Sequence, residues 1–477
     1  MRRDHGNGLP RRIVRRSARL DPWLLVLLLL AAAPRFVGFA RGATQITPDS
    51  ISYLNLARQM RGIPVAGGWD EWANLPRDGQ GARTPGYPLF LNAAFLVSGW
   101  RPSPPILVER LARIPRFDPW HLRLLATEED LDAVRLLQHA LGLLATGLAY
   151  LTVRRWTGRR WLAALVAAAA IGLRPAWWYV HERIVHTEAL AATLVVVAVW
   201  ALARLEGTVG ARGPGLAVSA ATAAAVLVRP AAAFAAPAFL LGLPWVTARW
   251  RWGLVALSWL LFGLLVGGWV VRNGVRYDYW GLSTVLAQNL ASHVQGFPQP
   301  FTDPLLRRLC VEHCQRPWAP DWILRAMVQD HGFSYVSAVR RLQAEVGHAI
   351  LQQPRAYIAS VAGSFVRFSH PSESFMAGPR ATGRFMSRLP ATFWLFAGTA
   401  YAVAGVAGVL SAFLARTPRS ARVAAAAVIL SALGVALTAR EELNIVRHAF
   451  PTESLALMAG GAALHRALDR LRFRTDP

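Results

Sequence analysis

The sequence contains no lysine, so arginine supplies all 52 basic residues, as in chains encoded by GC-rich genomes. Acidic residues are also scarce, with 27 against those 52, which leaves a formal net charge of +25. The arginines lie in short patches between apolar runs, where the positive-inside rule places basic residues. We therefore expect membrane lipids as partners through their anionic head groups, and no nucleic acid.

Cysteine is nearly absent as well: Cys310 and Cys314, in the stretch LCVEHCQ, are the only two. With His313 between them they offer two thiols and one imidazole, a weak set for a metal. A local disulfide, a pair of free thiols and a metal site all remain open. A disulfide would fit a loop outside the cytoplasm.

Long apolar runs dominate what is present. Hydrophobic residues make up 54% of the chain, the mean hydropathy is +0.30, and 19 tryptophans suit membrane-interface belts. Several runs come close to the ~20 apolar residues that cross a bilayer. The sequence predicts an all-α polytopic membrane protein of about ten transmembrane helices, with interfacial helices in two long outer loops.

The apolar runs and the basic patches define a domain organisation. We expect a basic tail at 1–21, a transmembrane module at 22–271, a second outer loop at 272–389, transmembrane helices at 390–466 and a tail at 467–477. The first outer loop, 41–130, contains two interfacial segments, SISYLNLARQM and PGYPLFLNAAFLVSGW. The predicted spans are Pro22–Ala40, 131–153, 161–180, His186–Leu205, two helices in 214–246 that turn near Arg229, 253–271, 391–415, Val423–Ala439 and Pro451–Leu464.

This arrangement places every short arginine patch on one side of the membrane and both long loops on the other. The patches are RRIVRR, RRWTGRR, ARWRW, RTPRSAR and RALDRLRFR. The positive-inside rule then predicts a bacterial inner-membrane protein with both termini in the cytoplasm. No internal repeat is evident, which disfavours many secondary transporters.

Polar motifs follow the outer ends of the predicted helices. They are TPDSISYLNLARQM, RTPGYPLFL, HERIVHTEAL, VRP and ELNIVRHAFPTESL. In the acid and YLNLAR of the first motif, in RTPGYPLFL, in TEAL and in RHAFPTESL, the chain resembles the C-type membrane glycosyltransferases. The resemblance is greatest to glycosyltransferase family 39, the dolichyl-phosphate-mannose–protein mannosyltransferases and bacterial relatives that modify lipid A. The resemblance implies that a sugar passes from a polyprenyl-phosphate donor to a lipid, glycan or protein acceptor at the outer face.

Two acids are the candidate catalytic residues. Asp49 matches the position of the family's loop-one acid, and the resemblance implies that it takes the proton of the acceptor hydroxyl. Some relatives have a second acid directly after it, where this chain has Ser50. Glu188 would orient the acceptor, or hold a divalent metal together with Asp49. The alternative for both acids is a role in starting a helix.

Four basic residues are candidates for the donor phosphate: Arg447, His448, Arg83 and Arg229. A guanidinium presents a fork that matches phosphate oxygens, and the charge that develops on the leaving phosphate needs such a partner. The alternative is that these side chains extend to the membrane surface without binding a ligand.

Five further residues are candidates for the lining of the substrate site: Tyr53, Tyr87, His181, Glu182 and His186. The alternative is that each lies at the membrane interface without contacting substrate. Two other functions also remain open. One is a different carrier-lipid enzyme of the O-antigen ligase or polymerase kind, and the other is a transporter of lipid-linked sugars.

Overall fold

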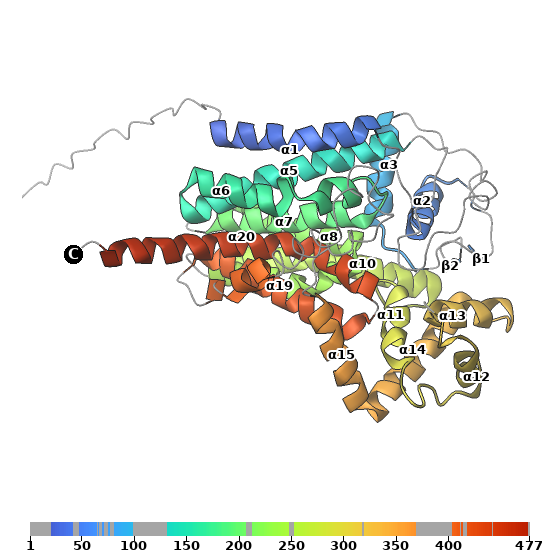
Figure 1. Cartoon of the computed structure of the whole chain (residues 1–477). Coiled ribbons are helices and arrows are strands. Elements are labelled where there is room, and N and C mark those ends of the chain that lie inside the picture. The colour runs from blue at the N-terminus through green and yellow to red at the C-terminus, as the bar shows by residue number, and fades with distance from the viewer. Residues whose placement is uncertain are drawn as a thin grey trace, which may run out of the picture.

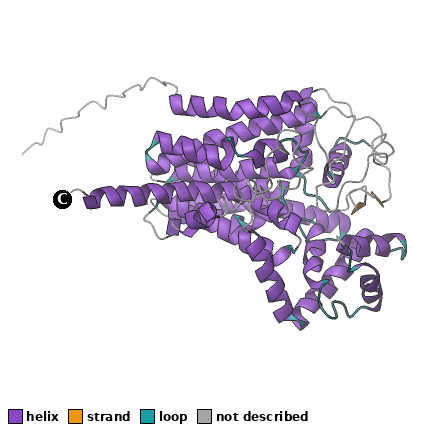
Figure 2. Cartoon of the chain, in the orientation of Figure 1, coloured by secondary structure: helices purple, strands orange, loops and turns teal. Residues whose placement is uncertain are grey.

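The structure, a computed structural model, describes residues 21–41, 47–63, 65, 69–70, 75–76, 81–98, 131–206, 212–247, 252–316, 319–368, 403–410, 412–413, 417–440 and 442–475. Figure 2 shows that these residues are almost entirely helical. The one sheet among them pairs β1 (Trp69–Asp70) with β2 (Leu75–Pro76), two residues each. The predicted all-α class is confirmed.

Nine helices among the described residues run side by side in one bundle (Figure 1). They are α1 (Pro22–Arg41), α5 (Asp132–Thr157), α6 (Arg160–Ala167), α7 (Thr187–Leu205), α8 (Arg212–Val228), α9 (Ala236–Val246), α10 (Trp252–Tyr277), α19 (Arg419–Thr438) and α20 (Glu442–Thr475). The central helix is α7, in which 78% of the residues of the most apolar stretch are buried. In α10 the corresponding share is 11%, so most of its side chains face outward.

Six helices within the described part of the chain are long and apolar enough to cross a membrane: Pro22–Ala40, Asp132–Thr157, Arg160–Trp178, Thr187–Leu205, Trp252–Tyr277 and Arg419–Thr438. The chain is therefore a multi-pass membrane protein. Each of the six helices coincides with a span predicted from the sequence. The predicted pair in 214–246 appears as the shorter apolar helices α8 and α9, joined by the 3-10 helix η3 (Pro230–Phe234) at the expected turn. Residues 1–20 of the predicted tail 1–21 and most of the predicted span 391–415 lie outside the described residues.

One crossing is irregular. After α6 the chain continues in two π-helical turns, η1 (Ala168–Gly172) and η2 (Ala176–His181), on either side of Arg174 and Pro175. Proline has no backbone N–H, so it interrupts the regular ladder of hydrogen bonds. The interruption turns η2 and the residues after it toward α1 and α5, which η2 contacts.

Contacts between charged residues gather the arginine patches at one end of the bundle. Asp21, before α1, pairs with Arg154 at 2.6 Å, and Arg159 pairs with Asp469 of α20 at 2.8 Å. Glu206, after α7, accepts hydrogen bonds from the first turn of α19. The patches RRWTGRR, RTPRSAR and RALDRLRFR thus share one end. RRIVRR and most of ARWRW lie outside the described residues.

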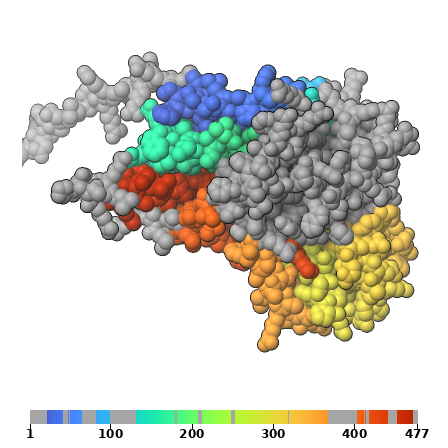
Figure 3. All heavy atoms as spheres, viewed as in Figure 1, coloured from blue at the N-terminus to red at the C-terminus, as the bar shows by residue number. Residues whose placement is uncertain are grey.

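The opposite end carries the two loops. The first loop forms α2 (Pro48–Met60) and α3 (Gly86–Ser98), the two segments expected to be interfacial. The second is a helical unit, which we call the outer lobe: α11 (Val285–Val294), α12 (Pro304–His313), α13 (Ala319–Gln329) and α14 (Tyr335–Gln352), with α15 (Pro354–Phe368) leading back to the bundle. Figure 3 shows the lobe projecting beyond the bundle. It has its own apolar core, and Cys310 and Cys314 form a disulfide in it.

Candidate functional site

The first turn of α2 is fixed by its cap. Thr47 is the N-cap: its hydroxyl accepts a hydrogen bond from the Ser50 backbone N–H at 3.3 Å, and the Ser50 hydroxyl accepts from the Thr47 N–H at 2.8 Å. The Ser50 hydroxyl also donates to the carbonyl of Val185 at 2.6 Å. Asp49 is therefore not the cap of this helix. Its side chain is left for other contacts, while the neighbouring Ser50 attaches the first turn of α2 to the segment before α7.

Asp49 forms an ion pair with Arg83, which precedes α3. Arg83 also donates from Nε to the Ser52 hydroxyl at 2.8 Å, and that hydroxyl donates to the Asp49 carbonyl at 2.7 Å. On the other side of the carboxylate, the His186 Nε2 atom lies 3.4 Å from Oδ2. The Asp49 side chain is 27% exposed, more than those of Arg83 (11%) and His186 (3%), so the carboxylate is the accessible edge of this group.

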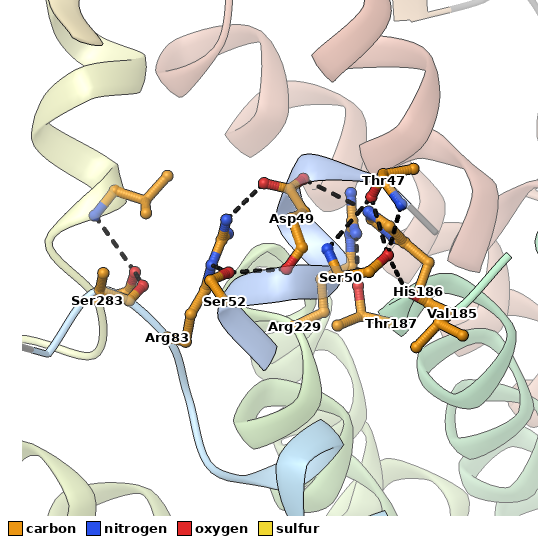
Figure 4. Close-up of polar contacts among 12 residues, drawn as sticks. Thr47, Asp49, Ser50, Ser52, Arg83, Val185, His186, Thr187, Arg229 and Ser283 are labelled. Atoms are coloured by element: carbon orange, nitrogen blue, oxygen red, sulfur yellow. Dashed lines mark hydrogen bonds and ion pairs between the residues drawn. The ribbon is translucent and has the colours of Figure 1, made fainter. Parts of the chain in front are cut away.

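Glu188 lies behind His186 in the first turn of α7 and is 1% exposed. Its carboxylate contacts His186 Nδ1, and its Oε1 lies 3.1 Å from the Arg229 guanidinium. Arg229 also donates to the Thr187 hydroxyl at 2.8 Å. Figure 4 shows Asp49, Arg83, His186, Thr187 and Arg229 converging from α2, the segment before α3, the start of α7 and the end of α8.

Five of the residues described so far form a continuous row, Arg83–Asp49–His186–Glu188–Arg229, which we call the acid–arginine row. Two carboxylates face two guanidiniums, and the imidazole touches both carboxylates. Buried charges are costly unless paired, and here each acid has an arginine partner. The row thus holds a carboxylate near solvent with positive charge beside it. This is what a group needs in order to accept a proton near a leaving anion.

The tyrosines occupy different surroundings. Tyr53 packs edge-on against Tyr87 at 5.3 Å between ring centroids and against His186 at 6.3 Å, and the Arg83 guanidinium lies 4.9 Å from its ring centroid. Tyr53 therefore contacts the row. Tyr87 is fully buried and donates its hydroxyl to Gln138 Oε1 at 2.7 Å, which joins α3 to α5.

Glu182 lies in a separate charged cluster. Its carboxylate accepts two hydrogen bonds from Arg35 of α1, at 2.8 and 2.6 Å, and lies 2.7 Å from Nδ1 of His139 of α5. Its neighbour His181 is buried at the end of η2. Sequence reasoning missed Arg35 and His139. A charged residue inside an apolar run was the available signal, because such residues are rare and need a partner.

Two of the candidates for binding the donor phosphate lie on α20. Arg447 and His448 lie in its first half, and their side chains are outside the described residues. Further along, Glu453 pairs with the buried Arg174 at 2.7 Å, and the Trp177 indole donates to the Ser454 hydroxyl at 3.2 Å. This half of α20 therefore packs against the irregular crossing that leads to the acid–arginine row.

A metal at Asp49 and Glu188 stays a prediction. Within the described ranges no group of three or more His, Cys, Asp or Glu side chains has the spacing of a metal site. Both acids contact arginine and His186, so cationic partners are already beside them. Of the three possibilities left open for Cys310 and Cys314, the structure has the disulfide, so neither cysteine is a free thiol that could hold a metal.

No family model and no curated protein matches the chain. Among solved structures it is similar to ArnT from Cupriavidus metallidurans bound to undecaprenyl phosphate, with a TM-score of 0.37 and 14% identity over 95% of this chain and 79% of that one. It is also similar to the oligosaccharyltransferase AglB from Archaeoglobus fulgidus in complex with an inhibitory peptide and a dolichol-phosphate, with a TM-score of 0.44 and 13% identity over 95% of this chain and 51% of that one. The chain spans about half the length of AglB. Similarity at this level assigns neither activity nor substrate.

Proposed function

We propose that this chain is a membrane glycosyltransferase that moves a sugar from a polyprenyl-phosphate donor to a lipid, glycan or protein acceptor. The reaction would occur at the outer face of a bacterial inner membrane. The observation that carries the proposal is the acid–arginine row, in which the Asp49 carboxylate is the accessible member and is flanked by Arg83 and His186. The proposed carrier is of the same lipid class as the ligands of ArnT and AglB, undecaprenyl phosphate and a dolichol-phosphate.

In the proposed reaction the acceptor hydroxyl oxygen attacks C1 of the sugar while its proton passes to Asp49. The bond from C1 to the phosphate oxygen breaks, and the phosphate leaves with the bonding electrons. Because attack and departure occur on opposite faces of C1, a single displacement inverts the anomeric configuration. The base accelerates the attack by taking the proton as the new bond forms.

The leaving phosphate requires positive charge, and the arginines supply it. Arg83 lies beside Asp49, while Arg229 is 6% exposed and engaged with Glu188 and Thr187. We assign Arg83 to the binding of the leaving phosphate, with Arg447 and His448 of α20 as further phosphate-binding residues. Arg229 and Glu188 then hold His186 in place, and His186 orients Asp49.

The donor's prenyl chain requires an apolar surface next to these charges. α3 begins three residues after Arg83 and presents Leu89, Leu96 and Val97 outward, with 56%, 74% and 81% of each residue exposed. An apolar helix face at the level of the interface can lie in the acyl region of the bilayer. The arrangement keeps the tail in lipid while the head group reaches Asp49.

The direct test is an assay with purified protein in liposomes. A panel of polyprenyl-phosphate sugars is combined with candidate lipid, glycan and protein acceptors, and mass spectrometry follows the free carrier and the glycosylated acceptor. We expect acceptor-dependent release of carrier from at least one donor. Saturable donor binding without release would contradict the proposal. Movement of intact donor across the membrane of sealed vesicles would favour a transporter instead.

A further inference from the structure

The segment that carries Arg83 is attached to the start of the outer lobe. The Ser283 hydroxyl donates a hydrogen bond to the carbonyl of Ala82 at 2.5 Å, and the backbone N–H of Thr284 donates to the carbonyl of Gly81 at 3.2 Å. Ser283 and Arg83 appear together in Figure 4. These residues are about 200 positions apart in the sequence, so the contact joins the two outer loops.

The attachment is buried. Ala82 is 1% exposed and belongs to the apolar core of the outer lobe. Gly81 has a φ of +79°, and a side chain there would meet Tyr277 at 3.6 Å and Thr284 at 3.9 Å. A buried backbone carbonyl needs a hydrogen-bond donor, and the Ser283 hydroxyl provides one for Ala82.

The same segment is held from the other side by the bundle. The Thr84 hydroxyl lies 3.4 Å from the carbonyl of Val228, the residue before Arg229. A Cβ on Gly86 would come within 2.7 Å of the Val228 backbone nitrogen, so the two chains approach closely there. The backbone of Arg83 is therefore fixed between the outer lobe and the end of α8.

We propose that Ser283 is a positioning residue, which through Ala82 directs the Arg83 guanidinium onto Asp49. The inference rests on the proposed function, because it assigns the outer lobe a part in that same site. Without the hydroxyl the Ala82 carbonyl loses its donor, and the adjoining peptide turns to find another. Arg83 then leaves the carboxylate, and the ionised form of the base loses its nearest cation.

A simpler role for Ser283 must be separated from this one. Its hydroxyl also accepts a hydrogen bond from the Val285 backbone N–H at 3.3 Å, so Ser283 contributes to the start of α11. Ser292 lies in the same helix, is buried to a similar degree (5% exposed against 6%), and donates its hydroxyl to the Asn289 carbonyl. Ser292→Ala removes an equivalent bond of α11 with no contact to the Arg83 segment, and is the matched control.

The experiment compares pH–rate profiles of carrier release for the wild type, Ser283→Ala, Ser283→Thr and Ser292→Ala. We expect Ser283→Ala to lower kcat roughly tenfold, because a small misplacement of a charged group is costly in catalysis, with little change in acceptor KM. The pH below which activity is lost should rise, and Ser283→Thr, which keeps the hydroxyl, should restore both properties. A Ser283→Ala profile identical to that of Ser292→Ala would overturn the proposal.

A second readout is independent of activity. The coupling between Asp49 and Arg83 is measured by thermal unfolding of a double-mutant cycle, Asp49→Asn with Arg83→Gln, in the wild-type and Ser283→Ala backgrounds. We expect the coupling to fall by at least half in the Ser283→Ala background and to persist in Ser292→Ala. Equal coupling in all backgrounds would refute the positioning role. Failure of the proposed function appears separately, as undiminished turnover by Asp49→Asn.

Discussion

Arg83 and Asp49 form an ion pair across 34 positions of sequence, and the carboxylate is the more exposed partner. This difference in exposure determines which of the two side chains an incoming molecule meets first. A hydroxyl that approaches this exposed edge meets the carboxylate first, with the less exposed guanidinium beside it. An exposed arginine with its acid behind would suit anion binding and leave no base within reach.

Glu188 and Arg229 form the buried end of the row, and we expect single substitutions there to destabilise the protein. Glu188→Gln leaves the guanidinium buried without its charged partner, which costs roughly 3–5 kcal/mol for a buried pair. Replacing both residues, Glu188→Gln with Arg229→Met, removes the unpaired charge. The measurement is the thermal unfolding midpoint in detergent: the double variant should unfold above the Glu188→Gln single variant. A double variant that loses the sum of the two single effects would contradict the pairing.

The Arg35–Glu182 cluster depends on a glycine in α5. A Cβ on Gly142 would lie 1.9 Å from Glu182 Oε1 and 2.9 Å from the Arg35 guanidinium. Gly142→Ala must therefore displace the carboxylate and should lower the unfolding midpoint strongly, by an amount that corresponds to roughly 3 kcal/mol. Among the described residues, a Cβ on Gly147 of the same helix meets Leu28 at 3.9 Å, an ordinary van der Waals contact, so Gly147→Ala is the control. Alanine favours helices over glycine, so the control should be neutral or stabilising. Equal effects of the two substitutions would show that the cluster is not packed as described.

His293 predicts a pH dependence of the contact between the outer lobe and the bundle. It lies in α11, and its Nδ1 is 2.8 Å from the Ser360 hydroxyl of α15. Burial, together with the positive charge of Arg440, lowers the pKa of His293 from 6.5 to about 4, although a hydrogen bond involving Ala439 opposes the shift. The folded state thus keeps this imidazole neutral. The ring also packs edge-on against Tyr357, at 5.5 Å between centroids.

The direction in which stability depends on pH follows from that lowered pKa. Between pH 6.5 and about 4 the unfolded chain binds a proton that the folded chain does not, so stability falls as the pH falls through this window. The full effect corresponds to about 3 kcal/mol, and stability is unaffected above the window. His293→Gln should flatten this part of the profile, measured as unfolding midpoint against pH. An unchanged slope in the variant would assign the pH dependence to other groups.

The apolar periodicity of the chain was sufficient to predict the bundle, because each long run must bury itself in lipid or in neighbouring helices. It predicted interfacial helices in both long loops, but not that those of the second loop, a segment rich in Pro, His and Arg, pack into a unit with its own apolar core. Helices such as α14 present apolar residues on one face only, and so leave no long apolar run. They pack mainly against one another and also against Ala82 of the first outer loop, and no local sequence pattern predicts a contact between segments so far apart.

Part of the candidate site was accessible from sequence for the same reason. Asp49, Glu188, Arg83 and Arg229 stand at the ends of apolar segments, and the alternation of crossings places those ends together. His186 was expected to line the site, but its position between two carboxylates depends on the turn before α7. The cluster of Glu182 with Arg35 and His139 required knowledge of which helices are neighbours, which the order of helices along the chain does not provide.

Asp49, the most exposed member of the acid–arginine row, is the residue to which we assign the role of base. The most direct measurement is carrier release by Asp49→Asn beside Asp132→Asn, which alters a more exposed acid (53%) paired with Arg135 at the same end of the bundle. Loss of a general base should lower kcat by roughly 10²–10⁴-fold in Asp49→Asn. Asp132→Asn should keep near wild-type turnover. Undiminished turnover by Asp49→Asn would contradict the account, and would fit an enzyme of the O-antigen ligase kind that needs no acid there.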